Sequence, residues 1–511
     1  MLDSPDDAAT SRATSHPDRG HETRSAPGSP DGVDPSLWDP ARRALTIGLL
    51  LTVTLVALES LAVATVMPEV RSDLGGYTLY GWVFSGFFLA SILGIVAGGQ
   101  AADQHGLAPA FAVGVVLFGT GLVIAGLSTS MAMLVGGRLL QGLGAGIVPA
   151  VAYAVIARAF PTRLRPKMFA LLSTAWVVPG LIGPALAAAV EHALSWRWVF
   201  LGLLPVVVVA GTMTFPALLA AGSGIAAKRT PSPQPGVPGP LISNGRLGES
   251  AAASQRRANR ERARRVLALV AGVGAVFVAA SGVDGVVGVG VAAVGAVAAV
   301  WAFIHLVPPG TVRLRRGVPA TVAVRGLLTW CFFQADAYIS LAVVDGRHAT
   351  TWMAGAALSA GSVLWACGSW LQSRQIETLG PRRLVSSGLA LITVSILLAL
   401  GVSLGLPVVV IVVAWAIGGF GMGMAYAPLA LVVLAAAKPG EEGAASAALQ
   451  LSDVVGVTLG TGLGGALVGL GDSRGWAVST SVAAVFATAA LMAVCALAAS
   501  SRLPTQVVEH G

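Results

Sequence analysis

Charged residues are scarce in this chain of 511 residues, because only 11% are Asp, Glu, Lys or Arg. Soluble domains carry about 25% charged residues, so the chain has less than half of the usual supply for a water-facing surface. Hydrophobic residues make up 55% of the sequence. These proportions exclude a soluble multidomain enzyme and a disordered protein, and they indicate a polytopic membrane protein.

Several reactive sequence patterns are also missing. The three cysteines lie in apolar runs, so no disulfide framework is implied. No cluster of His, Cys and Asp has metal-ligand spacing, and neither a Walker A loop nor a Gly-x-Ser-x-Gly motif is present. We therefore expect no metal site, no enzyme and no ATP-driven transport. Glycine is abundant, with 64 residues, which favours close packing of helices in lipid.

Long apolar runs begin after Arg43, and each is close to the ~20 residues that cross a bilayer. The stretch 266–308 would be roughly 64 Å long as a single helix, about twice the hydrocarbon core. Asp284-Gly285 marks a turn near its centre, so we divide this stretch into two spans. The sequence predicts 14 spans, with bounds near 44–67, 77–98, 107–128, 131–157, 168–190, 197–221, 266–283, 286–308, 318–343, 350–371, 384–405, 407–436, 443–469 and 475–498.

The basic residues indicate the orientation of these spans. With the N-terminus in the cytoplasm, 26 of the 32 Lys and Arg residues lie inside, four lie outside, and Arg138 and Arg325 lie within spans. This bias predicts a multi-pass protein of the plasma (inner) membrane with both termini cytoplasmic. The net charge of +8 therefore reflects membrane topology, and we expect no nucleic-acid partner.

Three polar segments lie outside the spans. Residues 1–43 contain few large apolar side chains and are predicted to form a disordered cytoplasmic tail. Residues 222–265 are predicted to be a cytoplasmic linker, whose basic end either anchors the topology or rests on anionic lipid headgroups. Residues 499–511 form the expected cytoplasmic C-terminal tail.

An internal repeat divides the spans into two sets. A shift of 277 residues aligns the glycine motifs 142–146 and 419–423, Gly183 and Gly460, the small pairs 187–188 and 464–465, and Glu59 and Asp336. We predict an all-α integral membrane protein with two six-helix bundles, 44–221 and 309–498, related by a pseudo-two-fold axis. The residues 266–308 are inserted between them as a transmembrane hairpin. In transporters, such bundles rock against one another.

Four motifs stand in the first half of the chain. They are Leu58-Glu59-Ser-Leu-Ala-Val-Ala-Thr-Val-Met67-Pro68, Gly99-Gln-Ala-Ala-Asp103-Gln-His-Gly106, Arg138-Leu-Leu-Gln141-Gly142-Leu-Gly144 and Gly180-Leu-Ile-Gly183-Pro184. These motifs resemble those of the major facilitator superfamily, and within it those of the 14-span drug:proton antiporter branch, over residues 44–498. Three departures from the family pattern are Glu59 in place of Asp, the lack of basic residues after Gly106, and Ala187-Ala188 in place of Gly-Gly.

The resemblance implies a function as well as a fold. The last of the four motifs resembles the antiporter motif, which implies export. The resemblance also implies a small-molecule substrate, protons and membrane lipids as partners, a monomer, and the proton gradient as energy source without a bound cofactor. It assigns conformational roles to Gly99, Asp103, Gly106, Arg138, Gln141, Gly142, Gly180, Gly183 and Pro184.

Three charged residues are expected at one depth in the membrane. Charge within a span costs about 2.5–3.5 kcal/mol on insertion scales, so each such residue needs a partner or a function. Glu59 lies roughly 12 Å and Arg138 roughly 10 Å from the outer face, and Asp336 falls in the same layer. We predict that Glu59 and Arg138 pair and face a central cavity, with Asp336 opposite on the second bundle.

These groups allow two interpretations. As proton-coupling sites, Glu59, Arg138 and Asp336 would exchange a proton for a cationic substrate as the cavity alternates between the two sides of the membrane. As structural groups, Glu59 and Arg138 would only clasp two spans together. Asp453 is either an inner proton-coupling site or part of a polar cluster with Gln450 and Ser452.

Aromatic side chains of the span 318–343 are the candidates for substrate binding. Trp330, Phe333 and Tyr338 share this span with Asp336, and we predict that they bind the substrate together with Asp336 and Glu59. The alternative is that these rings face lipid or the headgroup layer. Arg325, in the same span, is expected to snorkel or to pair near the inner half of the membrane.

The sequence thus predicts a proton-coupled secondary active exporter of hydrophobic or cationic amphipathic compounds. One alternative keeps this fold and changes the cargo to a lipid or an endogenous metabolite. Another is a membrane enzyme or a sensor, which would need a catalytic cluster or a folded soluble domain, and the sequence shows neither.

Overall fold

All regular structure in the described part of the chain is helical. The computed structural model describes residues 37–160, 164, 168, 171, 175, 177–229, 245–280, 285–437 and 442–506. Most of the predicted tail 1–43, the middle of the linker 222–265 and the first part of the predicted span 168–190 lie outside these residues. A helical fold suits this composition, because backbone groups in lipid must form their hydrogen bonds within the chain.

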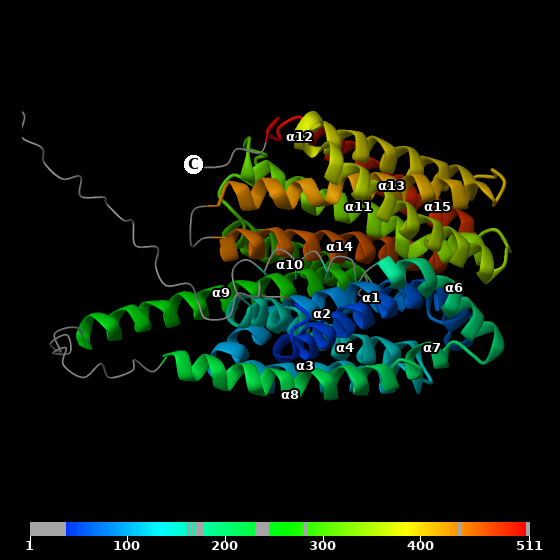
Figure 1. The fold of residues 1–511 in the computed structure, drawn as a ribbon. Coiled ribbons are helices and arrows are strands. Elements are labelled where there is room, and N and C mark those ends of the chain that lie inside the picture. The colour runs from blue at the N-terminus through cyan, green and yellow to red at the C-terminus, as the bar shows by residue number, and fades with distance from the viewer. Residues whose placement is uncertain are drawn as a thin grey trace, which may run out of the picture. The chain divides into compact units, whose positions relative to one another are not determined.

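The first bundle contains the helices up to residue 229 (Figure 1). α7 and α8 follow one another closely and together form one candidate span, Arg197–Ala220. The helices are α1 (Pro40–Leu74), α2 (Tyr77–Gln104), α3 (Leu107–Gly126), α4 (Met131–Ala159), α6 (Val177–Ala193), α7 (Arg197–Leu201) and α8 (Leu204–Arg229).

The inserted hairpin and the second bundle follow. The hairpin is formed by α9 (Gly245–Ala280) and α10 (Gly285–Leu306), which pack against each other. The second bundle contains α11 (Val318–Val344), α12 (Thr351–Ser403), α13 (Val410–Ala435), α14 (Glu442–Ser473) and α15 (Val478–Ser500).

Twelve helices of the described residues are long and apolar enough to cross a membrane, and the sequence predicts 14 spans. Two predicted spans, 350–371 and 384–405, lie in α12, which has 53 residues and bends at Gly380, where φ is 74°. A straight helix of that length would measure roughly 80 Å, more than twice the hydrocarbon core. α6 has 17 residues and covers only part of the predicted span 168–190. The count of 14 stays a prediction.

A glycine motif, 142–146, lets α4 pack closely between α2 and α3. Gly142 and Gly146 face α2, where a β-carbon on either residue would overlap a carbonyl oxygen. Gly144 faces the other way, and a β-carbon there would lie 2.5 Å from the carbonyl oxygen of Gly114 in α3. Backbones that approach this closely gain the dispersion contacts that hold helices together in lipid.

The aligned motif, 419–423, gives α13 the same surroundings. Gly419 and Gly423 face the first arm of α12 (351–379), and Gly421 faces the second arm (381–403). The first arm therefore corresponds to α2 and the second arm to α3. The two halves share a packing arrangement as well as a sequence pattern, which agrees with the predicted pseudo-symmetry.

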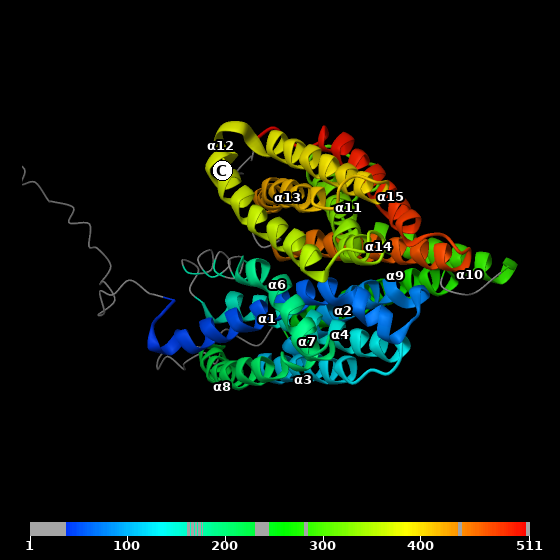
Figure 2. The same ribbon diagram turned by 90° about the vertical axis from the view of Figure 1, so that its right-hand side faces the viewer.

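The two bundles meet mainly along α2 with α14 and along α6 with α12, and α1 contacts α11 and α12 (Figure 2). Along α2 and α14, a β-carbon on Gly81 or on Gly465 would overlap the backbone of the other helix. Aromatic rings add to this interface, since Tyr80 and Tyr338 lie 5.6 Å apart between centroids. We call this line of contact between α2 and α14 the seam.

The bundles are joined at one end of the helices, which we call the distal end. α1, α11 and α14 finish there, and α2 and α12 begin there. Arg71 of α1 forms an ion pair of 3.0 Å with Asp345, the residue after α11. Burial raises the pKa of Asp345, and the Arg71 guanidinium opposes that shift. The distal end is therefore closed by polar as well as apolar contacts.

The glycine packing predicts unequal effects of two alanine substitutions in α4. We expect Gly146→Ala to lower the midpoint of thermal unfolding in detergent micelles, because overpacking a helix interface costs about 1–3 kcal/mol. Gly136→Ala is the matched control: its β-carbon would meet no atom of a described neighbouring helix within 4 Å. Alanine also favours a helix over glycine by about 0.5–1 kcal/mol. Circular dichroism follows the unfolding of both variants. Equal midpoints would contradict the interpretation that Gly146 packs closely against α2 and that Gly136 does not.

Candidate functional site

The first bundle buries an ion pair between α1 and α4. The side chains of Glu59 and Arg138 are 0% and 2% exposed, and Arg138 Nη1 donates a hydrogen bond to Glu59 Oε1. Gln141, one turn along α4, donates from Nε2 to Glu59 Oε1 at 3.4 Å and accepts from Arg138 Nη1 at 3.2 Å. The two residues that the sequence placed at one depth thus lie together, and both side chains are buried. Whether they face a central cavity stays a prediction.

Arg138 is held on its other sides by α2. Its Nε donates to the carbonyl oxygen of Val83 at 3.0 Å, and its guanidinium lies 4.2 Å from the ring centroid of Phe87. On Glu59, the second carboxylate oxygen, Oε2, is buried and has no hydrogen-bond partner among the described residues. Because buried polar atoms are nearly always paired, this oxygen marks a position where a proton or a bound group would find an acceptor.

Asp336 holds the aligned position in the second bundle. It lies on α11, and Trp415 of α13 donates its indole N–H to Asp336 Oδ1 at 2.9 Å. A shift of 277 residues aligns Trp415 with Arg138, as it aligns Asp336 with Glu59. The repeat therefore relates the Glu59–Arg138 pair to an Asp336–Trp415 pair, in which a neutral indole takes the place of the guanidinium.

The Glu59–Arg138 pair and the Asp336–Trp415 pair differ in charge. Arg138 balances Glu59, so the first pair is neutral when both groups are ionised. An indole N–H donates a hydrogen bond and carries no charge. Since burial of an uncompensated charge is costly, Asp336 is best accommodated when it is protonated or when a cation lies beside it.

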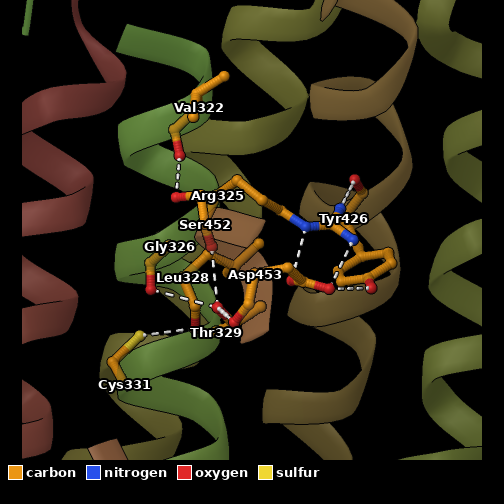
Figure 3. A network of polar contacts seen from close by, with 9 residues as sticks. All are labelled: Val322, Arg325, Gly326, Leu328, Thr329, Cys331, Tyr426, Ser452 and Asp453. Carbon is orange, nitrogen blue, oxygen red and sulfur yellow. Dashed lines mark hydrogen bonds and ion pairs between the residues drawn. The ribbon is translucent and has the colours of Figure 1, made fainter. Parts of the chain in front are cut away.

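A further ion pair lies between α11 and α14 of the second bundle (Figure 3). Arg325 donates from Nε to Asp453 Oδ1 at 2.8 Å and from Nη2 to Oδ2 at 3.4 Å. The ring centroid of Tyr426 in α13 lies 3.1 Å from the guanidinium carbon, and its hydroxyl donates to Asp453 Oδ2 at 2.9 Å. Arg325 Nη1 also donates to the Tyr426 carbonyl oxygen at 2.7 Å. Asp453 is therefore compensated by a cation and a phenol.

These contacts bear on one of the two roles that the sequence allows for Asp453, namely membership of a polar cluster with Gln450 and Ser452. Ser452, one of its predicted cluster partners, donates instead to the carbonyl oxygen of Val322 in α11 at 2.7 Å. The cation beside Asp453 is Arg325, for which the sequence allowed either snorkelling or pairing. The two residues are 128 positions apart, and no local pattern connects them. Whether Asp453 also takes part in proton coupling stays a prediction.

An aromatic row connects Asp336 and Asp453 of the second bundle. Successive ring centroids are 5.2, 5.7 and 5.6 Å apart, in the order Trp415, Phe332, Trp365 and Tyr426. The first ring donates to Asp336 and the last to Asp453. Phe333, a predicted substrate contact, packs beside the row at 5.4 and 6.4 Å from its two middle rings. The π-faces of such rings attract cations.

Trp330 and Tyr338, the other two predicted substrate contacts, are not part of this row. Trp330 Nε1 donates to Gln334 of the same helix at 2.9 Å. Tyr338 is fully buried, and its hydroxyl donates to the Thr461 carbonyl oxygen at 2.8 Å. Because its ring also contacts Tyr80, Tyr338 belongs to the contact between the bundles in this conformation. Substrate binding by these two residues stays a prediction.

The motif residues between α2 and α3 lie at a helix end. Gly106 has φ of 94° and precedes α3, a backbone conformation that glycine adopts without strain. At Gly99, near the end of α2, a β-carbon would meet no described neighbouring atom within 4 Å. Asp103 lies on α2, and its side chain lies outside the described part of the structure.

The antiporter-like motif lies on α6, where the two bundles meet. Gly180 packs against Ser362 of α12, and the carbonyl oxygen of Pro184 also faces α12. Gly183 packs against α1 of its own bundle. The motif therefore places small residues where α6 contacts the first arm of α12, an interface that changes if the bundles move.

The described site contains three buried or half-buried acidic side chains with different partners. Within the described ranges, no three His, Cys, Asp or Glu side chains gather as a metal ion would require. The acidic residues comprise two that are balanced by arginine and one, Asp336, that is bonded to an indole. An acid in an apolar region with a neutral partner can take up either a proton or a cation.

The buried pair predicts non-additive effects on stability. Arg138→Met leaves Glu59 buried without its cation, and Glu59→Leu leaves Arg138 without its anion, so each is expected to cost about 3–5 kcal/mol of the free energy of unfolding. The double variant Glu59→Leu/Arg138→Met removes both charges and is expected to regain most of that loss. Thermal unfolding in detergent micelles measures all three. A double variant whose loss equals the sum of the two single losses would show that the charges do not interact.

Known proteins match this chain at the level of sequence. Residues 49–376 match the family model described as Major Facilitator Superfamily. The chain is 30% identical over 162 residues to Multidrug resistance protein 3 of Bacillus subtilis (strain 168), covering 32% of this chain and 32% of that protein. It is 27% identical over 164 residues to Multidrug efflux pump SdrM of Staphylococcus aureus (strain N315), covering 32% and 37%. The matches span about a third of the length of these curated relatives.

Solved structures match the fold over most of the chain. The crystal structure of a D-xylose-proton symporter aligns with a TM-score of 0.61 at 14% identity, over 91% of this chain and 98% of that chain. Identity at this level shows the fold alone. The family model, the two glycine-packed bundles and the helices long enough to cross a membrane agree, and the chain belongs to the Major Facilitator Superfamily, a family of membrane transporters and not of enzymes.

Proposed function

We propose that the protein is a proton-coupled secondary active exporter of hydrophobic or cationic amphipathic compounds. It works by alternating access in the plasma (inner) membrane, with both termini in the cytoplasm and the proton gradient as its energy source. Membership of the superfamily supports transport of a small molecule, and relatives named as a multidrug resistance protein and a multidrug efflux pump support drug-like cargo.

The observation that carries the proposal is the neutral partner of Asp336. In the first bundle, Arg138 balances the aligned acid, Glu59. In the second bundle, Trp415 supplies only a hydrogen bond, so Asp336 needs a proton or a substrate cation as its counter-charge. Competition between the two for one carboxylate couples uptake of the proton to release of the cargo.

The membrane potential contributes to such an exchange only when more than one proton enters per monovalent cation or when the cargo is neutral, because a one-for-one exchange moves no net charge. Each net elementary charge that moves inward gains about 2.3 kcal/mol per 100 mV. By the relation of tenfold per 1.4 kcal/mol, that energy sustains a substrate gradient of roughly fiftyfold. A one-for-one exchange at Asp336 is driven instead by the difference in pH across the membrane.

The aromatic row is the proposed contact surface for the cargo. It runs from the partner of Asp336 to the partner of Asp453, so a cation that leaves one acid meets π-faces before it meets the other. Flat, apolar rings select for amphipathic compounds without demanding one shape. This arrangement favours drug-like cations over small polar metabolites.

Under the expected orientation, the distal end faces the outside of the cell. The contacts of the seam and the Arg71–Asp345 ion pair then hold the outer side closed. The described conformation would be the one that receives cargo from the cytoplasm. Export requires these distal contacts to open.

Proton coupling at Asp336 predicts a selective loss of transport. In proteoliposomes with an internal pH dye, we expect a lipophilic cation to evoke proton movement. Asp336→Asn should slow that movement about tenfold or more, since each 1.4 kcal/mol of lost cation binding is a factor of ten. Glu59→Gln should slow it less, because Arg138 and Gln141 still bond the amide. Asp472→Asn, on an exposed side chain of α14, is the matched control and should leave the rate unchanged.

Two outcomes of this assay would count against the proposal. An unchanged rate in Asp336→Asn would remove Asp336 from the coupling mechanism. Movement of a labelled lipid or metabolite without any proton flux would favour the alternative cargo on the same fold.

The aromatic row predicts a change in substrate affinity. Trp365→Ala is expected to raise the KM for an aromatic cation roughly two- to thirtyfold, which corresponds to a cation–π contribution of about 0.5–2 kcal/mol. Trp370→Ala is the matched control, because this ring lies on the same arm of α12, is 58% exposed and contacts Arg374. Uptake into inverted membrane vesicles measures KM. Equal KM values for the two variants would place the cargo elsewhere.

A further inference from the structure

The inserted hairpin lies against both bundles. α9 contacts α2 of the first bundle and α14 of the second, and Figures 1 and 2 both show it beside these helices. Apolar side chains of the three helices form one continuous core, with Leu269 and Val273 from α9, Leu89 and Ile92 from α2, and Val455 from α14. The hairpin is therefore attached across the seam and not to one bundle alone.

Phe277 is the side chain of α9 that bridges the seam at its distal part. It is 6% exposed, whereas the next residue, Val278, is 50% exposed. The ring meets Trp82 of α2 edge-on, with centroids 5.8 Å apart and an interplanar angle of 84°. On its other side it fills the space above Gly462 of α14, where a β-carbon would overlap the ring.

The backbone contact of the seam lies directly beside this ring. Gly81 of α2 and Gly465 of α14 line the same small pocket as Phe277, Trp82 and Gly462. A β-carbon on either of the two seam glycines would overlap the other helix. If α2 and α14 separate at the distal end, Phe277 keeps its contact with one of the two helices and loses its contact with the other.

We propose that Phe277 is a positioning residue that holds the seam closed, so that the inserted hairpin sets the balance between the two conformations of the transporter. The inference rests on the alternating access of the proposed function. Lipid is as apolar as the protein interior, so opening the seam costs Phe277 no hydrophobic burial. What it loses is one of its two contacts, the aromatic contact with Trp82 or the dispersion contacts with Gly462, because both form together only when α2 and α14 are in place.

A distance measurement across the distal end tests this inference. The three native cysteines, Cys331, Cys367 and Cys495, are replaced by alanine, and spin labels are attached at Ser72→Cys on α1 and Ser473→Cys on α14. Both positions are exposed and lie at the distal end of opposite bundles. Double electron–electron resonance in nanodiscs then reports the populations of closed and open forms.

Phe277→Ala is expected to raise the ratio of long to short label distances roughly two- to tenfold, the effect of losing one aromatic contact. Val278→Ala, which removes a neighbouring side chain of α9 that points away from the seam, should leave the ratio unchanged. Phe277→Leu keeps an apolar side chain and should give an intermediate ratio. A Phe277→Ala distribution equal to that of Val278→Ala would overturn the inference.

Gly462→Ala tests the same contact from the opposite helix. The added β-carbon displaces the ring of Phe277, so the ratio should shift in the same direction even if Phe277→Ala fails to fold. An unchanged ratio in Gly462→Ala would also overturn the inference. The label distances need no substrate or proton gradient. If the ratio of label distances shifts but the protein shows no proton movement in proteoliposomes, the proposed function is rejected and the inference about Phe277 stands.

Discussion

Close approach of helix backbones is the constraint on which the rest of this structure depends. Lipid provides no hydrophobic driving force between helices, so van der Waals contact at small residues must hold them together. The motifs 142–146 and 419–423 make that contact inside each bundle, and Gly81 and Gly465 make it between the bundles. The same kind of contact thus holds each bundle together and also forms the seam between them.

The pseudo-symmetry of the packing is not matched by symmetry of charge. Glu59 and Arg138 neutralise one another within the first bundle, and their network reaches three helices. At the aligned positions, Asp336 and Trp415 keep the hydrogen bond and lose the cation. In the proposed mechanism, a proton or a substrate cation supplies a counter-charge to Asp336, whereas Arg138 already supplies one to Glu59.

The sequence predicts the helices and the repeat, and it predicts that Glu59 and Arg138 pair, because hydropathy and spacing along one chain encode these features. It does not predict which distant helices touch. Asp453 meets Arg325 across 128 residues, and Phe277 meets Gly462 through the packing of an insertion that has no aligned counterpart. The role of Trp415 was available from the offset of 277 residues, but an uncharged indole gives no sign of unusual cost in a membrane.

The bend in α12 has a mechanical consequence. Its two arms are separate helices that meet at Gly380, where φ is 74° and ψ is 162°, so the connection between them is very short. The first arm contacts α6 of the other bundle, and the second arm lies on the far side of α13. Because the connection at Gly380 is short, the adjoining ends of the two arms must move together when the first arm shifts against α6.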